Sequence, residues 1–517
     1  MSGLPEVIDR FLEEFLPKSG LIPVGTPKKR IVRDAVWGMI ELEPHESILV
    51  DTPLFQRLRG ISQTGFTYFV YPCAIHTRFE HSLGCLHIAA RLLDALHSRS
   101  REIEPDHMLT VRLAALLHDV SHCIFSHVSE EIYGGDDGIH KAREEICELF
   151  PEDRNIAKIG AAEVIVFEIL TSKRFAAFFD ELRNKVGKDC LPDGVRPINI
   201  ARIIVGLPLE EHQSLRFLTQ IVNGPFDADK LDYQARDGYF TGIGFRVDID
   251  RLLASLCIAE QDGIAHLAID YRGVAAIEQL LFNRMLLYDS VYHHHKNRAA
   301  VQLFRKYVSS ESSLSLDWFM NHDEHDFFGH RDLPDDLHEL AVKLRRRELP
   351  HRAVVIHPTT VNVPEHEESK WGYVAAKHFS KDGVDRDWVD KWITKLKANM
   401  REILDDSSVD IFIDFPSTPQ FHEIQRFTYI QYAGHTVKLE DVFPITSTLG
   451  TYSQQYKYRV YIFAGKDDRV QVAAAAYKAL LNRGIQLNKE AFRLAKLDPR
   501  DVEEAAGVAI PDKAPRR

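Results

Sequence analysis

From about residue 28 to about residue 310, apolar positions recur every three or four residues, the period of an amphipathic helix. The segment HSLGCLHIAARLLDALHSR forms one such face over residues 81–99, and MLTVRLAALLHDV forms another over residues 108–120. Residues 273–308, beginning GVAAIEQLL, continue the pattern without Pro or an internal Gly, which predicts a long helical stretch. The first two faces consist of Leu83, Leu86, Ala90, Leu93 and Leu96, and of Leu109, Leu113, Leu116 and Leu117.

The pattern changes after about residue 350, where short β-branched and aromatic runs are bounded by Pro or Gly. RAVVIHP, VDIFIDFP and YRVYIFAG predict strands, and RVQVAAAAYKALLNRG predicts a helix that ends at Gly484. We therefore expect a mainly α protein with a helical core and a smaller C-terminal α/β (α+β) lobe. The expected parts are an N-terminal extension (1–27), the core (28–330), the lobe (331–495) and a tail (496–517), whose last residues, AAGVAIPDKAPRR, are expected to be mobile.

The composition is that of an ordinary globular protein, and it narrows the range of partners. The 517 residues include 64 Lys and Arg against 76 Asp and Glu, a net charge of −12. This balance disfavours a general nucleic-acid-binding surface, although a local basic pocket stays open. Apolar runs are too short for a membrane span, and no N-terminal signal pattern is present. Six cysteines without a CxxC pair indicate reduced thiols, so we expect a cytoplasmic protein that does not contact membranes.

The stretch LAALLHDVSHCIFSH, residues 113–127, ends an apolar helical pattern in a cluster of titratable groups. Positions i and i+4 share one helix face, so His118 and His122 are expected to be neighbours, with Asp119 beside them. Imidazole and carboxylate together suit a first-row divalent metal. A His-Asp pair is weak evidence by itself, because such pairs more often cap a helix or satisfy each other.

Two other segments add the groups that such a site would need. HTRFEHSLG contributes Arg78 and His81, and NGPFDADKLDYQARD contributes Asp229 and Lys230. His81 and Asp229 would complete a site of two histidines and two aspartates, with positive charge from Arg78 and Lys230 beside it. Mixed nitrogen and oxygen ligation leaves positions for water and phosphate oxygens, which suits metal-assisted hydrolysis.

The sequence resembles the HD-domain phosphohydrolases, and within them the deoxynucleoside triphosphate triphosphohydrolases. The motifs DTPLFQRLRGISQTG, YPCAIHTRFEHSLG, LLHDVSHCIFSH, FDADKLDYQARD and VYHHHK occur in the family's order and at family-like separations. The strong motifs run from about residue 31 to about residue 300, and a weaker resemblance continues to about residue 490. The resemblance implies an HD-domain core and an enzyme of deoxynucleotide metabolism.

The resemblance also implies roles for individual residues. The family reaction is attack of water on the α-phosphorus of a dNTP, which releases a deoxynucleoside and intact triphosphate. A divalent metal (Mn, Mg, Fe, Ni or Zn) would be held by His81, His118, Asp119 and Asp229. Catalytic roles would fall to His122, His127, His140 and Glu130. Substrate contacts would come from Gln63, Arg78, Lys230, Tyr233, Asp237, Tyr288, Tyr292 and His294.

Many family members are allosteric homo-oligomers with regulatory nucleotides bound between subunits. Asp51, Gln56 and Arg59 match residues of a guanine-binding regulatory site. The resemblance therefore implies a dimer or tetramer, with GTP or a dNTP as activator. The DTPLFQRLRG segment also has a structural interpretation, because Asp51 or Thr52 can cap a helix that Pro53 begins.

Some positions depart from the family pattern. Ser121, Cys123 and Ile124 stand where the family often has glycines and a proline, and Thr64 replaces an apolar residue that packs against the sugar. These changes leave the metal ligands alone but bear on the fit of the substrate. One alternative is an HD-family nuclease or nucleotidase that acts on single-stranded nucleic acid or another phosphoester. A second alternative is a catalytically silent nucleotide-sensing protein.

Two other histidine-rich segments are weaker candidates. Successive residues of a helix point in different directions, so the three histidines of HHHK (293–296) cannot all face one site. The segment NHDEHDFFGHRDLPDDLHEL is acidic, and its composition predicts a solvated loop and helix start rather than a metal site.

Overall fold

The structure is a computed structural model of the chain. It describes residues 3–16, 28–99, 101–151, 156–209, 213–244, 247–308, 314–362, 386–416, 428–443, 448–449, 452 and 457–512. These residues fall into two compact units. The first unit comprises residues 1–287, 308–338 and 423–444, and the second comprises residues 288–307, 339–422 and 445–517.

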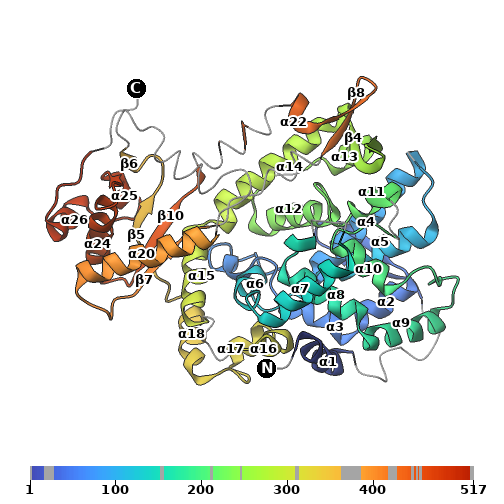
Figure 1. Cartoon of the computed structure of the whole chain (residues 1–517), viewed down its shortest axis with the longest axis horizontal. Helices are drawn as coiled ribbons and strands as arrows, with labels where there is room; N and C mark the ends of the chain where they lie inside the picture. The colour runs from blue at the N-terminus through green and yellow to red at the C-terminus, as the bar shows by residue number, and fades with distance from the viewer. Residues whose placement is uncertain are drawn as a thin grey trace. The chain divides into compact units, whose positions relative to one another are not determined.

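The first unit is mainly helical, as expected, and is built around α4 and α5 (Figure 1). The long α4 (Arg78–Arg99) packs against both α5 (Pro105–Leu117) and α12 (Ala228–Thr241). The other helices of this unit are α1 (Leu4–Phe15), α2 (Pro44–Asp51), α3 (Pro53–Gln56), α6 (His127–Tyr133), α7 (Asp137–Leu149), α8 (Ala161–Thr171), α9 (Lys173–Val186), α10 (Pro197–Ile204), α11 (Arg216–Thr219), α13 (Ile249–Ser255), α14 (Val274–Leu287), α16 (Leu316–Asn321), α17 (Glu324–Gly329) and α22 (Leu439–Val442).

The apolar faces expected from the sequence are the faces that these helices bury. Leu83, Leu86, Leu93 and Leu96 of α4 are at most 2% exposed. Thr52 caps α3, because its side chain accepts a hydrogen bond from the Phe55 N–H, and Pro53 opens the helix. The expected capped helix start is therefore confirmed.

Two small sheets complete the first unit. The strands β1 (Arg30–Asp34) and β2 (Gly38–Leu42) form an antiparallel hairpin. A second sheet has the order β3 (Leu256–Gln261), β4 (Ile264–Asp270), β8 (Tyr429–Tyr432) and β9 (His435–Lys438). β4 and β8 are parallel, so a segment from late in the chain extends the β3–β4 hairpin. These strands were not predicted, because their short stretches interrupt a helical pattern.

The second unit holds the three strands predicted near the C-terminus. β5 (His351–Ile356), β10 (Val460–Ala464) and β7 (Ile411–Asp414) form one antiparallel sheet with β10 in the centre. β6 (Val361–Asn362) pairs with β11 (Gln486–Leu487). The helices are α15 (His295–Tyr307), α20 (Arg386–Leu404), α24 (Arg469–Leu481), α25 (Glu490–Arg493) and α26 (Pro499–Ala506), while α18 (Asp335–Arg345) spans the boundary between the units.

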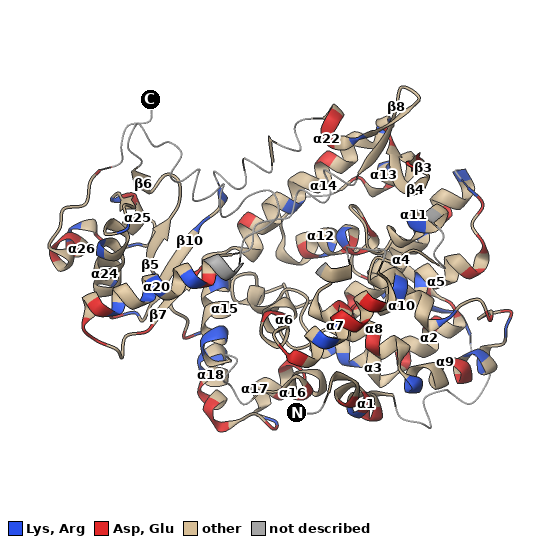
Figure 2. Cartoon of the chain, viewed as in Figure 1, with Lys and Arg blue, Asp and Glu red and all other residues tan. Residues whose placement is uncertain are grey.

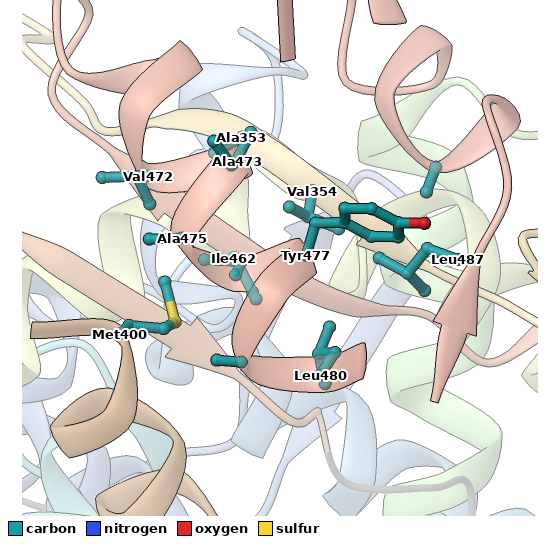
Figure 3. Close-up of a cluster of buried hydrophobic side chains, with 14 of the residues drawn as sticks. Ala353, Val354, Met400, Ile462, Val472, Ala473, Ala475, Tyr477, Leu480 and Leu487 are labelled. Carbon is teal, nitrogen blue, oxygen red and sulfur yellow. The ribbon is translucent and has the colours of Figure 1, made fainter. Parts of the chain in front are cut away.

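The core of the second unit gathers around α24 (Figure 3). Tyr477 and Leu480 of α24 are fully buried with Val354 of β5 and Ile462 of β10. α24 is followed by Gly484 at φ +76°, a conformation that suits glycine, so the predicted helix stop is confirmed.

The tail predicted over residues 496–517 contains a helix in the part that the structure describes. Residues 499–506 form α26, and Val502, Ala506 and Ile510 are buried in the core around α24. The apolar residues of this segment were too sparse to show a period, but their burial against α24 is what orders the helix.

The long helical stretch expected over residues 273–308 is interrupted. α14 ends at Leu287, a π-helical turn (η7) covers Tyr288–Tyr292, and α15 starts at His295. The boundary between the units falls at the start of this turn. Wide turns of this kind often occur near functional sites.

Lys and Arg alternate with Asp and Glu on the helices of each unit, α9, α20 and α26 among them (Figure 2). This mixture agrees with the acidic net charge of the chain, −12. Among the described residues, no helix combines the length and the apolar character needed to cross a membrane.

Gly84 sets the distance between α4 and α12. A Cβ atom at this position would overlap the carboxylate of Asp232 and the guanidinium group of Arg236. Both of these groups are fully buried, so neither can move aside into solvent. Only glycine allows the two helices to approach this closely.

Gly84→Ala is expected to lower the free energy of unfolding by about 1–3 kcal/mol, because overpacking forces buried groups apart. The measurement is denaturant unfolding of the full chain. Gly329→Ala is the matched control, since Gly329 is exposed and a Cβ there meets no atom within 4 Å. Equal stability of the two variants would contradict the close-packing argument.

Candidate functional site

His81 and His118 of the first unit direct their Nε2 atoms toward the same place. His81 on α4 is fully buried, and its Nδ1 lies 2.7 Å from Asp232 Oδ2. His118 follows the last residue of α5, and its Nδ1 lies 2.9 Å from the carbonyl oxygen of Ala115. A carbonyl or carboxylate oxygen can only accept, so each Nδ1 carries a hydrogen, and each Nε2 is the nitrogen left to bind a metal. Histidines that bind metals are oriented in this way.

Two carboxylates face these Nε2 atoms. Asp229 Oδ1 lies 3.1 Å from His81 Nε2. Asp119 Oδ2 lies 3.5 Å from His81 Nε2, and its Oδ1 lies 3.3 Å from His118 Nε2. Burial alone would raise the pKa of both carboxyls, but hydrogen bonds and positive neighbours, Arg78 beside Asp119 and His81 beside Asp229, hold them below the usual range. The structure thus brings together the four residues for which a ligand role was predicted.

This donor set fits a divalent metal. Two imidazole Nε2 atoms and two ionised carboxylates are the mixture that first-row metals accept. Potential ligand atoms of His81, His118 and Asp229 lie within 4.8 Å of one another, together with Cys85 Sγ. The helices α4, α5 and α12 hold these groups, so the site rests on rigid elements.

Cys85 is a neighbour of the site that the sequence analysis missed. It lies one helical turn after His81 on α4, and its Sγ is 3.5 Å from His81 Nε2. Burial raises the pKa of the Cys85 thiol, so the sulfur carries its hydrogen at neutral pH. The available signal was the i, i+4 spacing from His81 in HSLGC, which places both side chains on one face.

A buried ionic chain supports His81 from behind. Arg236 donates to both oxygens of Asp232, each at 2.9 Å, and to Asp34 Oδ2 at 2.8 Å. The Trp37 indole N–H also donates to Asp232 Oδ1, at 2.5 Å. Burial would raise the pKa of Asp232, but Arg236 and the hydrogen bond from His81 lower it to about 2. Asp232 is therefore ionised, and it fixes the orientation of the His81 ring.

Arg78 lies between Asp119, a proposed metal ligand, and Ser126 in the loop that precedes α6. It is 3% exposed, its Nη1 donates to Asp119 Oδ2 at 2.7 Å, and its Nε donates to Ser126 Oγ at 2.9 Å. Its Nη2 is buried and makes no hydrogen bond within the described part of the chain. A buried guanidinium with an unused donor suits a phosphate oxygen.

The residues with a predicted catalytic role, His122, His127, His140 and Glu130, are only partly brought together. His127 Nδ1 lies 2.8 Å from Glu130 Oε2, and the rings of His122 and His127 are 5.1 Å apart. Burial opposes charge on Glu130, but His127 outweighs it and lowers its pKa to about 2. Burial and Arg78 lower the pKa of His122 to about 4, so this ring is neutral at pH 7. His127 and His140 are both exposed, His140 contacts Arg143, and its predicted catalytic role stays a prediction.

The loop between His122 and His127 has a strained backbone. Phe125 has φ +55° and Ser126 has φ +51°, values that non-glycine residues rarely adopt. Such a conformation costs roughly 1–3 kcal/mol for each residue and persists only when the surroundings impose it. Ser126 Oγ donates to the Ser62 carbonyl at 2.7 Å, and His127 follows directly as the first residue of α6.

The four other substrate-contact candidates of the first unit are spread around this centre. Gln63 Oε1 is buried and makes no hydrogen bond among the described residues. Lys230 Nζ donates to Asp227 Oδ2 at 2.7 Å and to the Gly224 carbonyl at 2.9 Å. Asp237 Oδ1 lies 2.7 Å from His76 Nε2 in a buried pair. The remaining candidate, Tyr233, is partly buried on α12.

The residues matched to a regulatory site already have partners within the chain. Asp51 forms a two-point ion pair with Arg30, at 2.7 and 2.5 Å. Gln56 Oε1 accepts a hydrogen bond from Arg59 Nε at 2.9 Å, and the Arg59 guanidinium stacks over the Phe79 ring at 3.5 Å. This surface is exposed at Asp51 and Arg59, and its predicted role stays a prediction.

The remaining candidates, Tyr288, Tyr292 and His294, belong to the second unit. The two tyrosine rings meet edge to face at 5.1 Å within the π-helical turn. His294 lines a cavity of about 270 Å³ with Arg352 and Arg459. Burial and the nearby Arg352 lower the pKa of His294, so this ring is neutral at pH 7.

Comparisons with known proteins agree with this geometry. Residues 78–177 match the model of the HD domain, and residues 247–389 match that of the HD associated region. An uncharacterized protein from Methanocaldococcus jannaschii is 28% identical over 464 residues, which cover 88% of this chain and 83% of that protein. A solved structure of a hypothetical protein from Aquifex aeolicus, 21% identical, covers 86% of this chain and 99% of that one with a TM-score of 0.59, which supports the fold.

The names of two vertebrate relatives state an enzymatic activity. Deoxynucleoside triphosphate triphosphohydrolase SAMHD1 of Danio rerio is 31% identical over 53% of this chain, and the human protein of the same name is 29% identical over 53%. This chain spans less than half the length of either relative, 44% and 43%. The HD-domain match covers His81 on α4 and His118 and Asp119, which directly follow α5. The chain therefore contains an HD domain followed by an HD associated region, and it is similar to proteins named deoxynucleoside triphosphate triphosphohydrolases.

Proposed function

We propose that the protein hydrolyses deoxynucleoside triphosphates to deoxynucleosides and intact triphosphate, by attack of water on the α-phosphorus. The observation that carries this proposal is the convergence of two histidine Nε2 atoms and two ionised carboxylates beside the unused donor of Arg78. The names of the vertebrate relatives support this choice of substrate. The metal would be held by His81, His118, Asp119 and Asp229.

Side chains of the protein would bind the phosphate and deliver the proton to the leaving group. A bound metal would polarise a phosphate oxygen and lower the pKa of a water molecule. The free Nη2 of Arg78 would hold a phosphate oxygen, and Lys230 would supply further positive charge. Glu130 holds the Nδ1 hydrogen of His127, so the Nε2 of this ring is the atom that would deliver a proton to the leaving 5′-oxygen. His122 is neutral and buried, and it would keep Asp119 in place through their 3.2 Å contact.

The sugar and base would be recognised by the other predicted contacts. Gln63 and Asp237 would accept hydrogen bonds from the 3′-hydroxyl, and Tyr233 would pack against the sugar. The substrate contacts predicted for Tyr288, Tyr292 and His294 stay predictions. We also propose a homo-oligomer whose regulatory nucleotide, GTP or a dNTP, binds near Asp51, Gln56 and Arg59.

The purified chain, supplied with Mn²⁺ or Mg²⁺, is expected to release intact triphosphate and a deoxynucleoside from at least one of the four dNTPs. Chelation with EDTA should abolish the reaction, because the water and the phosphate oxygens depend on the metal. Chromatography of the products, with and without GTP, makes the measurement. Single-stranded DNA and RNA oligomers in the same assay test for a nuclease. Cleavage of these oligomers without release of triphosphate would contradict the proposal.

His127→Gln is expected to lower kcat by about 10²–10⁴-fold, the usual contribution of a general acid, while the metal content stays unchanged. The measurements are steady-state kinetics and elemental analysis of the purified variant. His435→Gln is the matched control, because His435 is exposed on β9 of the same unit. Wild-type kcat in His127→Gln would exclude this residue as the proton donor.

Asp232→Asn is expected to weaken metal binding about 10–100-fold, the usual effect of removing a hydrogen-bond partner from a metal-binding histidine. The measurement is titration of metal into the metal-free full chain, which does not depend on any substrate. Asp250→Asn is the control, since Asp250 forms an exposed ion pair with Arg91. If both variants bound metal equally well, Asp232 would have no role in orienting His81.

A further inference from the structure

Glu324, the first residue of α17, connects two segments of the first unit that lie far from it in the sequence. Its Oε1 accepts hydrogen bonds from the Ser62 N–H at 2.9 Å, the Ser62 hydroxyl at 2.5 Å and the Phe125 N–H at 3.1 Å. The segment NHDEHDFF was expected to form a solvated loop and helix start, and Glu324 does begin a helix. Its side chain is half-buried, and its carboxylate accepts from main-chain donors of both segments.

Both segments carry residues of the proposed site. Ser62 precedes Gln63, and its carbonyl accepts the hydrogen bond from Ser126 Oγ. Phe125 and Ser126 are the two residues with strained backbone, and Ser126 Oγ also accepts from Arg78 Nε. Oε1 of Glu324 therefore binds both Ser62, which precedes Gln63, and the turn at Phe125 and Ser126, which precedes His127.

The packing of α17 keeps this carboxylate in place. Asp323 caps the helix by accepting from the N–H groups of His325 and Asp326. A Cβ atom at Gly60 would overlap the Asp323 side chain, so the start of α17 lies directly against the residues before Ser62. The ring of Phe125 contacts Phe327 edge to face at 5.4 Å. These contacts fix α17 against the strained turn independently of Glu324.

We propose that Glu324 is a positioning residue for the phosphohydrolase site. Its carboxylate keeps the segments around Ser62 and Phe125 at a fixed distance from each other. Ser126 then holds Arg78, and the turn holds His127, so that both would face the same phosphate. The carboxylate does not touch the reacting atoms and acts through these main-chain contacts. This inference rests on the proposed function for its kinetic consequence, whereas its structural consequence is independent of any substrate.

The test compares Glu324→Ala with Glu324→Gln in the full chain. Hydrogen exchange measured by mass spectrometry should become faster in Glu324→Ala over residues 61–66 and 124–128, while α5 keeps its protection. With dNTP as substrate, kcat should fall about 10–100-fold, as expected when catalytic groups are misplaced by about 1 Å. Metal content should stay at the wild-type level. Glu324→Gln keeps an acceptor oxygen for the two N–H groups and should restore most of the protection and most of kcat.

Asp335→Asn is the control, because Asp335 is fully exposed, and it should change neither measurement. Unchanged exchange over both segments in Glu324→Ala would overturn the proposal. Faster exchange along α5 with loss of metal in both Glu324 variants would also overturn it, because Glu324 would then be a general stability residue. If the wild-type chain released no triphosphate, the proposed function would fail, and the exchange data would still decide the role of Glu324.

Discussion

The ion pairs that join His81, Asp232, Arg236 and Asp34 are the constraint on which the site depends. All four side chains are buried, and removing charges from water is costly unless every charge has a partner. Here each charge has one: Arg236 bridges the two aspartates, and Asp232 also accepts from His81 and Trp37. Gly84 makes the arrangement possible, because a larger residue would separate α4 from α12. The orientation of the His81 ring is thus decided by contacts that lie outside the ligand set.

The two sides of the site are held by different means. The proposed metal side consists of His81 and Asp229 on helices and of His118 and Asp119 in the turn after α5. The proposed phosphate side consists of a turn with unfavourable backbone angles, which Ser62 and Glu324 hold through hydrogen bonds. The metal side would fix where a metal binds, whereas the turn before His127 depends on hydrogen bonds from a distant segment. The two sides would therefore fail separately, with loss of metal on one side and loss of proton transfer on the other.

Most of the helical core was predictable, because α4, α5 and α24 bury faces with clear three- and four-residue spacing. The grouping of His81, His118, Asp119 and Asp229 was predicted from the ordered motifs of the family resemblance, since the His-Asp pair alone was weak evidence. Cys85 was missed although its i, i+4 spacing from His81 was available. Asp232 and Glu324 were not assigned, since their roles come from tertiary contacts: Asp232 lies 151 positions from His81, and Glu324 lies 262 positions from Ser62. The order of residues 499–512 was missed for the same reason, because Val502 and Ile510 gain stability only against α24.

The metal ligands by themselves do not select a substrate, because any phosphoester offers oxygens to such a centre. Selection depends on the polar atoms around it that the described chain leaves without a hydrogen bond, among them Gln63 Oε1 and Arg78 Nη2. A buried polar atom without a partner costs about 1–3 kcal/mol, and a ligand that satisfies it recovers that energy. Gln63 would accept from a hydroxyl and Arg78 would donate to a phosphate oxygen, so together they favour a ligand with both groups close together. A nucleotide with a 3′-hydroxyl has this pair, whereas a phosphoester without a neighbouring hydroxyl would leave Gln63 unsatisfied.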